Sequence, residues 1–433
     1  MNNEVIKPVR EVNKLEVWKK NMYILSITQF LVMSAFSLII PFIPIYLKND
    51  LGVHNQTDIQ LWTGMIFGAT FLSAFLFQPI WGKIADKTSR KTILIRSALG
   101  MSLATALMTF SSSAWHLLVL RFILGIFGGF IPASSPFITM NTPKEKIGYA
   151  LGGAQSGAYA GNILGPLIGG ILGEWIGFYK ILYVSSSMLL IAGFLIFFFL
   201  TELNKPELTN LKHATTEKKQ LNFLLELQEI IKKPLIGPLF IAGFLIQFST
   251  MSTSPFLASY VESMWDKGVL LSTMVGLSVS ISGFSIMIFS PILGKKADQV
   301  GPEMILLICL FGNFICYVFQ ALFSSIWLFL FARFLMGIFI GGLLPSVISL
   351  IRIHAPQNME SLTFGYYHSA LFLGNLIGPI LGGYLSGIIH IKGVIFLAGL
   401  LFLMNSLTLK FYLFRQETYA SLFMKMKKSE GKL

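Results

Sequence analysis

The sequence has little charge for its length. Only 12% of its 433 residues are charged, whereas soluble globular domains carry about 25%, so a water-soluble fold of this size would lack charge to cover its surface. Cysteine is also scarce: Cys309 and Cys316 lie in one apolar run, which excludes a disulfide framework. Hydrophobic residues make up 54%, with 39 Phe and 39 Gly. This is the composition of a membrane protein, and it excludes a chain that is disordered, fibrous or nucleic-acid-binding as a whole.

Long apolar stretches recur along the chain. A membrane-spanning helix needs about 20 mostly apolar residues, and we predict twelve such spans. They are 22–47, 60–82, 92–110, 114–138, 147–173, 178–200, 235–262, 270–294, 303–322, 326–350, 362–388 and 392–414. The runs do not alternate between apolar and polar residues, so the prediction is an all-α integral membrane protein with twelve transmembrane helices in two six-helix repeats. We expect 22–47 to remain as the first span rather than to be removed as a signal peptide.

Positive charge gathers on one side of these spans. Of 33 Lys and Arg residues, 27 lie on the side of the termini, four lie on the other side, and Arg121 and Arg333 lie within spans. Because positive residues stay cytoplasmic during insertion, both termini are predicted to be cytoplasmic.

The longest polar stretch divides the chain into two halves. The predicted parts are a cytoplasmic segment at 1–21, helical bundles at 22–200 and 235–414, a central cytoplasmic loop at 201–234 and a cytoplasmic tail at 415–433. Within the loop, 221–233 has apolar residues near helical spacing. It fits either a short amphipathic helix on the inner membrane face or a flexible linker.

The two halves repeat one another, five residues at an offset of 212 and five at 213. The pairs are Gly82 and Gly294, Asp86 and Asp298, Arg121 and Arg333, Gly125 and Gly337, Gly129 and Gly341, Pro132 and Pro345, Gly165 and Gly378, Pro166 and Pro379, Gly169 and Gly382, and Gly170 and Gly383. A duplicated helical bundle is typical of secondary transporters, whose substrate site lies near the midplane between the halves. A membrane-embedded enzyme is the less favoured alternative, because the sequence has no phosphate-binding loop, no metal-spaced histidine pair and no nucleophile elbow.

Three segments carry a family resemblance: "GKIADKTSRK" at 82–91, "LRFILGIFGGFIP" at 120–132 and "GNILGPLIGG" at 161–170. On these the chain resembles the major facilitator superfamily, and within it the twelve-helix drug:proton antiporters. The resemblance implies a multi-pass protein of the plasma or inner cell membrane that exports drugs or other small amphipathic molecules in exchange for protons, by alternating access, and confers antibiotic resistance. It implies no enzymatic activity, no cofactor and no metal. The expected partners are a small-molecule substrate, protons and the lipid bilayer, with no nucleic acid, and the expected state is a monomer. The runner-up is an exporter of a metabolite or lipid-like molecule without proton coupling.

The motif at 82–91 predicts a conformational latch, with an ordinary positive inner loop as the alternative. In the family, the acid equivalent to Asp86 lies at a helix N-terminus of the other half, here near Ser361. The helix dipole favours a carboxylate there by roughly 0.3–1 kcal/mol. Gly82 permits close backbone approach, Arg90 is a candidate partner for Asp86, and Asp298 is its repeat counterpart.

Few ionisable residues lie within the spans. Arg121 lies about seven residues, or roughly 10 Å, from the outer end of its span. A buried arginine costs about 2.5–3.5 kcal/mol, so its side chain should face a cavity or a partner, unless it extends to the outer surface. The resemblance implies a role for Arg121 in proton transfer and substrate coupling. The acids Glu174, Glu262 and Asp266 lie only at outer helix ends, and His368 is a candidate titratable group or a packing residue.

Two further sets of residues complete the predicted site. Residues predicted to line the cavity are Gln29, Phe30, Gln155, Tyr159, Asn162, Gln247, Met251, Tyr367, His368 and Asn375. Such a lining suits bulky amphipathic or cationic solutes. The spacing of Gly161, Gly165 and Gly169 predicts close helix packing. The resemblance identifies these residues, with Pro166 and Gly170, as an antiporter motif. Pro41 and Pro44 predict a kink at the outer end of the first span.

Overall fold

The computed structural model describes residues 9–143, 146–202, 228–265, 270–356 and 359–430. The side chains of some helical residues, among them Gly82, Asp86, Ser361 and 414–430, also lie outside the description. Most of the predicted central loop, including Leu221, Leu224 and Leu225, falls outside it as well. Within the described ranges the structure is helical and contains no strand, as the sequence predicts.

The chain divides into two compact units. One comprises Met1–Glu217 with Asp266–Ser280, and the other Lys218–Trp265 with Ile281–Leu433. The first unit contains α1 (Val9–Ile39), η1 (Ile40–Phe42), α2 (Ile43–Asn49), α3 (Gln56–Lys87), α4 (Arg90–Met108), α5 (Ala114–Phe127), α6 (Phe130–Asn141), α7 (Ile147–Ile176) and α8 (Phe178–Phe199). The second contains α11 (Ile236–Thr253), η3 (Ser254–Phe256), α12 (Leu257–Glu262), α14 (Pro302–Leu322), α15 (Ile326–His354) and α16 (Glu360–Glu430). Helix α13 (Leu271–Val300) begins in the first unit and ends in the second.

Nine helical stretches of the described chain are long and apolar enough to cross a membrane. One of them, Leu362–Leu413, covers two predicted spans, and α16 is kinked between them at His390, where φ is 58° and ψ is 164°. The predicted span 114–138 is two short helices, α5 and α6, and the glycine-rich α7 is not among the nine. Twelve spans and cytoplasmic termini therefore remain predictions.

Proline interrupts α1 in the first unit and α11 in the second. Helix α1 gives way at Pro41 to the 3-10 turn η1 before α2 begins, which confirms the predicted kink. In the second unit, α11 gives way at Pro255 to η3 before α12 begins. Proline lacks a backbone N–H and clashes with the preceding helical turn. The repeat is therefore visible in the backbone as well as in the sequence.

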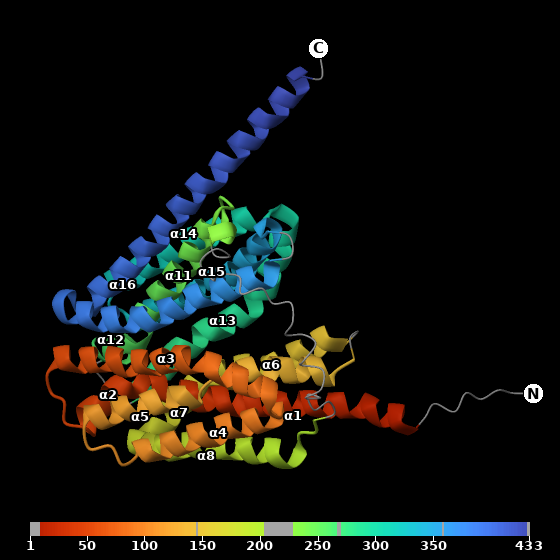
Figure 1. The fold of residues 1–433 in the computed structure, drawn as a ribbon. Helices are drawn as coiled ribbons and strands as arrows, with labels where there is room; N and C mark the ends of the chain where they lie inside the picture. The colour runs from red at the N-terminus through yellow and green to blue at the C-terminus, as the bar shows by residue number, and fades with distance from the viewer. Residues whose placement is uncertain (1–8, 144–145, 203–227, 266–269, 357–358, 431–433) are drawn as a thin grey trace, which may run out of the picture. The chain divides into compact units, whose positions relative to one another are not determined.

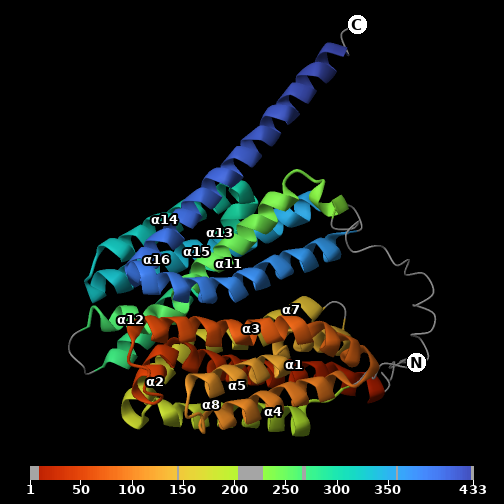
Figure 2. The same cartoon turned by 60° about the vertical axis from the view of Figure 1, so that its left-hand side comes forward.

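Glycine faces bring two pairs of helices together. In Figures 1 and 2, α1 lies beside α7 in the first unit and α11 lies beside α16 in the second. A Cβ atom on Gly157 or Gly169 of α7 would overlap the carbonyl oxygen of Ser26 or Leu38 of α1. The predicted close packing is therefore present. In lipid, where hydrophobic burial does not hold helices together, such van der Waals packing is a main source of helix association.

The second unit repeats this contact with different residues. Cβ atoms added to Gly374 and Gly378 of α16 would lie 2.7 and 2.9 Å from the carbonyl oxygens of Phe244 and Phe248 in α11. One added to Gly382 would overlap the carbonyl of Ser252.

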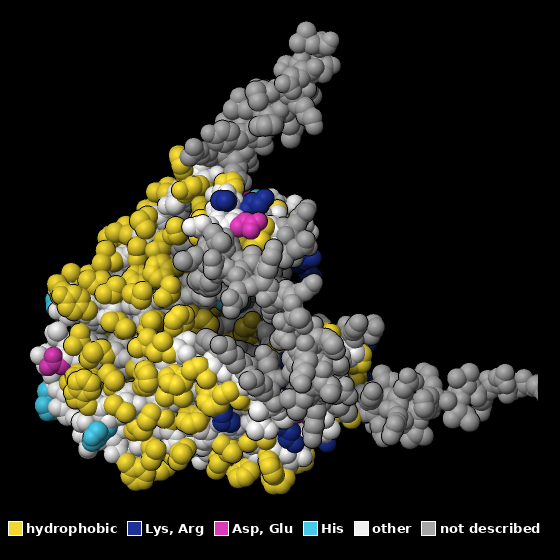
Figure 3. All heavy atoms as spheres, in the orientation of Figure 1, with side chains coloured by type: hydrophobic (Ala, Val, Ile, Leu, Met, Phe, Trp, Pro, Cys, Tyr) yellow, Lys and Arg dark blue, Asp and Glu magenta, His cyan; other side chains and the backbone are white. Residues whose placement is uncertain are grey.

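Large apolar side chains cover much of the outer surface. Phe198 is 68% exposed and Trp327 is 65% exposed, and hydrophobic side chains predominate on the face shown in Figure 3. An exposed apolar surface of this extent is unfavourable in water and favourable in a bilayer.

Candidate functional site

Arg121 projects from the buried face of α5. The helix begins after Ser113, whose side chain accepts a hydrogen bond from the His116 backbone N–H at 3.4 Å. Leu117, Arg121 and Leu124 recur at helical spacing on this face and are buried. The next buried residue, Gly125, lies so close to α3 that an added Cβ would overlap the backbone of that helix. The packing of α5 on α3 thus fixes the helix that carries Arg121.

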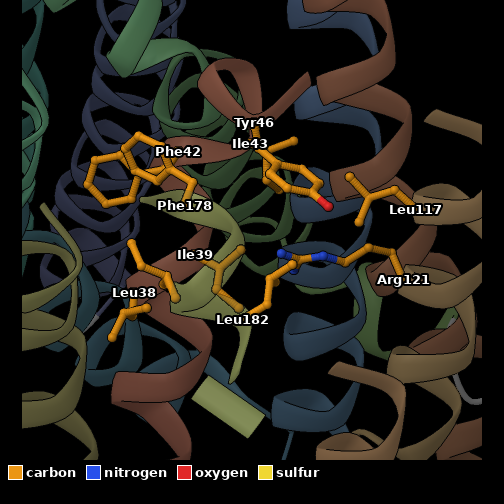
Figure 4. A pocket seen from close by; sticks show the side chains of 10 residues that line it. Leu38, Ile39, Phe42, Ile43, Tyr46, Leu117, Arg121, Phe178 and Leu182 are labelled. Atoms are coloured by element: carbon orange, nitrogen blue, oxygen red, sulfur yellow. The ribbon is translucent and has the colours of Figure 1, made fainter. Parts of the chain in front are cut away.

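The Arg121 guanidinium lies in an apolar cavity. Figure 4 shows it extending between aliphatic side chains toward the Tyr46 ring. Besides Arg121 and Tyr46, the cavity is lined by apolar side chains only: Leu38, Ile39, Phe42, Ile43, Leu117, Phe178, Ile181 and Leu182. Arg121 is 2% exposed, and its Nε and Nη2 atoms have no hydrogen-bond partner within the described structure. The side chain does not extend to the outer surface, and faces a cavity as expected.

Arg333, the repeat counterpart, has polar neighbours. It is 6% exposed, and its Nη2 donates to Ser282 Oγ at 3.2 Å, while Nη1 lies 3.8 Å from Met336 Sδ. Both arginines are therefore buried cations, but Arg333 donates to a side-chain hydroxyl, whereas two nitrogen atoms of Arg121 have no acceptor within the described structure.

Helix α5 ends at Phe127, and a break at Gly128 and Gly129 follows. Gly129 has φ of +95°, a conformation that favours glycine, and it separates α5 from α6. The break removes the intrahelical partners of two carbonyl groups. Trp81 Nε1 donates to the Ile126 carbonyl at 2.9 Å, and Ser97 Oγ donates to the Phe127 carbonyl at 2.6 Å. Neighbouring helices thus satisfy groups that would be costly to bury unpaired.

Further contacts that the sequence analysis did not identify lie near the C-terminal end of α3 and the start of α4. The Arg96 guanidinium lies 3.3 Å from the centre of the Trp81 ring, a cation–π contact. Glu202, after α8, accepts a hydrogen bond from the Arg90 backbone N–H at 3.0 Å and another from the Ser89 hydroxyl. The sequence signal for this contact was the acidic residue Glu202 among positively charged residues. Glu202 follows α8 in the sequence, but in the structure it lies beside the start of α4.

The predicted latch is only partly described. Asp86 lies in α3, but its side chain and that of Gly82 are outside the description. Asp298 is exposed on α13, and α16 begins at Glu360, close to the expected helix start. The role of these residues and of Arg90 remains a prediction.

The predicted lining residues are distributed over several helices of the two units. Gln29 is 1% exposed and donates to Ser134 Oγ at 2.8 Å, so it joins α1 to α6. Gln155, Tyr159 and Asn162 share an exposed face of α7. In the second unit, Tyr367 is buried, and His368 is exposed. The remaining predicted residues are half-buried: Phe30, Gln247, Met251 and Asn375.

Of the three acids, Glu174 contacts the start of α13. Its carboxylate accepts hydrogen bonds from the Thr273 hydroxyl at 3.0 Å and backbone N–H at 3.3 Å. Glu262 is half-buried at the end of α12, and Asp266 lies outside the described residues.

The antiporter motif faces α1 and the start of α13. Cβ atoms added to Gly161 and Gly165 would meet α1. One added to Gly170 would overlap the Ser272 carbonyl, and one added to Gly276 would overlap the Pro166 carbonyl. Spacing predicted a close-packed face without indicating its neighbour.

Two repeats of apolar helices, each with a matching glycine face and a buried arginine, define a membrane transporter built by duplication. The chain belongs to the Major Facilitator Superfamily, whose family model matches residues 25–272 and 239–428. It is a multi-pass membrane protein and a transporter rather than an enzyme.

Related proteins are similar in sequence to most of the chain. Multidrug resistance protein MdtG of Salmonella arizonae is 33% identical over 370 residues, covering 85% of this chain and 89% of that protein. MdtG of Salmonella typhi matches to the same extent.

Solved structures share the fold. A mutant of the nucleoside transporter NupG has a TM-score of 0.75 at 14% identity, covering 90% of this chain and 99% of that one. A bacterial homologue of the lysosomal transporter Spinster has a TM-score of 0.74 at 14% identity, covering 92% and 97%.

Proposed function

We propose that the chain exports drugs or other small amphipathic molecules across the cell membrane in exchange for protons, by alternating access. The observation that carries export is the 33% identity to MdtG over 85% of the chain. Alternating access follows the duplicated architecture, in which two bundles tilt about a shared site. Antibiotic resistance would follow if the exported molecules include antibiotics.

The proposed topology has twelve spans, with both termini cytoplasmic and the central loop at 201–234 joining the bundles. Its support is the charge distribution, with 27 of 33 Lys and Arg residues on one side. The proposed location is the plasma or inner cell membrane, and the proposed working unit is a monomer.

The polar helix faces are the proposed substrate surface. Gln155 and Asn162 of α7 are exposed in the first unit, while Gln247 and Asn375 are half-buried in the second. Amide side chains offer both donors and acceptors to a solute. We assign Glu262 and His368 as candidate titratable groups, and Asp86 with Arg90 and Asp298 as candidate latch residues.

Arg121 is the proposed coupling residue of the first half. A permanently charged group in an apolar cavity shifts the proton affinity of any acid or substrate brought near it. In the proposed topology Arg121 lies seven residues after the start of α5, so this influence would act near the outward entrance.

A second candidate function is export without proton coupling. No aspartate or glutamate is found among the buried polar side chains of the described residues. Proton coupling in membrane transporters generally uses an ionisable residue at membrane depth. Under this alternative, the substrate's own gradient would drive movement.

Transport by purified protein in liposomes separates the two candidates. Vesicles with the chain would be loaded with a fluorescent amphipathic cation, with and without an imposed pH gradient. We expect the gradient to accelerate dye movement and an ionophore that collapses it to abolish the acceleration. Equal rates in both conditions would favour the uncoupled exporter, and no movement of any dye would contradict drug export.

A further inference from the structure

We propose that the cavity beside Arg121 binds a single small inorganic anion of the size of chloride. The proposal concerns a binding site within the first unit and does not depend on the substrate that the protein moves. Its starting point is a charge without a counterion: the Arg121 guanidinium is 2% exposed, and two of its nitrogen atoms have no acceptor among the described residues.

No side chain that lines the cavity neutralises the positive charge of Arg121. The side chains that line the cavity include no carboxylate, and apart from Arg121 only Tyr46 carries a polar atom. An arginine stays protonated in proteins. An isolated buried cation is costly, and a bound counterion reduces that cost. The cavity therefore supplies positive charge and lacks the negative charge that would balance it.

The polar groups of the cavity are donors. Arg121 has N–H groups only, so it cannot accept a hydrogen bond. The Tyr46 hydroxyl has a weak contact with the Met108 carbonyl at 3.5 Å, a distance beyond that of a good O–H···O hydrogen bond. It can therefore turn to another acceptor. The Tyr46 hydroxyl can donate as well as accept, so an anion in the cavity would find two donors, one on α2 and one on α5, beside a positive charge.

The volume limits the size of the ligand. The cavity measures about 20 Å³, and a cavity needs roughly 10–15 Å³ on this measure to hold one water molecule. Chloride is larger than water, and one ion fits only by filling the cavity. A drug-sized molecule does not, because such ligands need pockets of about 300–1,000 Å³. The cavity alone is therefore too small to hold a transported solute of drug size.

Arg333 provides a matched control within the same chain. It is the repeat counterpart of Arg121 and is also buried, but its guanidinium donates to Ser282 Oγ at 3.2 Å. No anion is inferred there. The proposal thus predicts a halide effect that depends on one arginine and not on the other.

The experiment is thermal unfolding of purified full-length protein in sodium chloride, sodium bromide or sodium gluconate at constant ionic strength. Gluconate is too large for the cavity and serves as the reference anion. We expect chloride and bromide to raise the unfolding temperature in a saturable way. Arg121→Gln should abolish the rise, whereas Arg333→Gln should retain it. An equal rise in both variants, or none in the wild type, would overturn the proposal and leave water as the occupant.

Two further variants cover the case in which Arg121→Gln does not fold. Arg121→Lys keeps the charge but loses the fork of donors, and Tyr46→Phe loses one hydroxyl. Each should raise the apparent halide dissociation constant, by about tenfold for a lost charge-assisted hydrogen bond. In crystals grown in bromide, the anomalous signal should peak beside Arg121, and its absence there would contradict the assignment. Because these readouts need no transport, their failure is distinguishable from failure of the proposed export.

Discussion

Arg121 and Arg333 occupy equivalent positions of the two repeats but differ in their surroundings. Arg333 donates to Ser282, and the residue 212 positions earlier, Thr70, makes no such contact with Arg121. Met336 offers a sulfur to Arg333, where the first repeat has the hydrocarbon side chain of Leu124. The comparison teaches that the two halves share the cation but differ in the acceptors beside it. A buried cation without acceptors is the more reactive of the two toward an incoming anion.

The helices that carry the two arginines differ as well. From Arg121 to Pro132 the chain is one residue shorter than from Arg333 to Pro345. One residue turns an α-helix by about 100°. A continuous helix in the first half could therefore not present both Arg121 and Pro132 in the same directions as Arg333 and Pro345, and a break is needed. The break falls at Gly128 and Gly129, whereas α15 is continuous.

The residues next to the break differ from their counterparts in the second half. Trp81 and Ser97 donate to the carbonyl groups that the break releases. Their counterparts at an offset of 212 are Leu293 and Cys309, which instead face Gly342 of the continuous helix α15. Hydrogen-bond donors therefore lie next to the broken helix, and compact apolar side chains lie next to the continuous one.

The largest expected effect is on transport. Arg121→Gln should reduce pH-gradient-driven efflux by about a hundredfold, because it removes the permanent charge that is proposed to shift the proton affinity of a nearby acid or substrate. Arg333→Gln should reduce it only a few-fold, because its guanidinium is already bound to Ser282. Efflux rates from vesicles with matched amounts of each variant provide the measurement. Equal losses would remove the functional distinction between the two repeats.

The next effect is on stability at the helix break. Trp81→Phe removes the donor to the Ile126 carbonyl and weakens the contact with Arg96. We expect a loss of about 2 kcal/mol, within the range for a buried group left unpaired. Unfolding in mixed micelles gives the value. Leu293→Phe, at the equivalent position, tests only side-chain size, and a loss as large there would argue against the hydrogen bond as the cause.

Gly129→Ala should cost about 1–2 kcal/mol, since a residue with a Cβ resists the left-handed conformation. The same unfolding experiment on Gly341→Ala is the control, because Gly341 is inside a continuous helix and alanine favours helix. There we expect a change of about 0.5 kcal/mol or less, as an added Cβ would lie 3.2 Å from the Ser290 nitrogen and require a small shift. If both substitutions cost the same, the positive φ at Gly129 is not what maintains the break.

The smallest expected effect separates Ser97 from Cys309. Ser97→Ala should cost about 1 kcal/mol, the typical net value of one hydrogen bond. Cys309→Ser should not gain that amount, because α15 has no released carbonyl for the hydroxyl to satisfy. Unfolding of the two variants side by side measures the difference, and a stabilising Cys309→Ser would mean that α15 also has an unpaired acceptor.

The sequence predicted a large part of the architecture. Apolar runs gave the helices, Pro41 predicted the kink, and the spacing of Gly161 and Gly165 predicted close packing. These features depend on short-range rules of helix geometry and size. The family resemblance was also correct, because its motifs are long and specific.

The remaining features depend on residues far apart in the chain. The glycine spacing could not identify α1 as the neighbour, since a flat face fits any close helix. The sequence pairs Arg121 with Arg333 but does not predict how their surroundings differ. Ser282 contacts Arg333, whereas its counterpart Thr70 makes no such contact with Arg121. The break itself had a signal, the change of repeat offset from 212 to 213 between Gly129 and Pro132. Glu202 had none beyond its charge, because its hydrogen bonds reach α4 across more than a hundred residues.

Proton release on substrate binding tests the central claim most directly. Purified protein in weakly buffered detergent solution would be mixed with candidate amphipathic drugs while the pH is recorded. The account predicts that a drug which the protein transports releases protons in a saturable way, and that Arg121→Gln changes the release while Arg333→Gln preserves it. Transport of the same drug without any proton release would contradict exchange for protons.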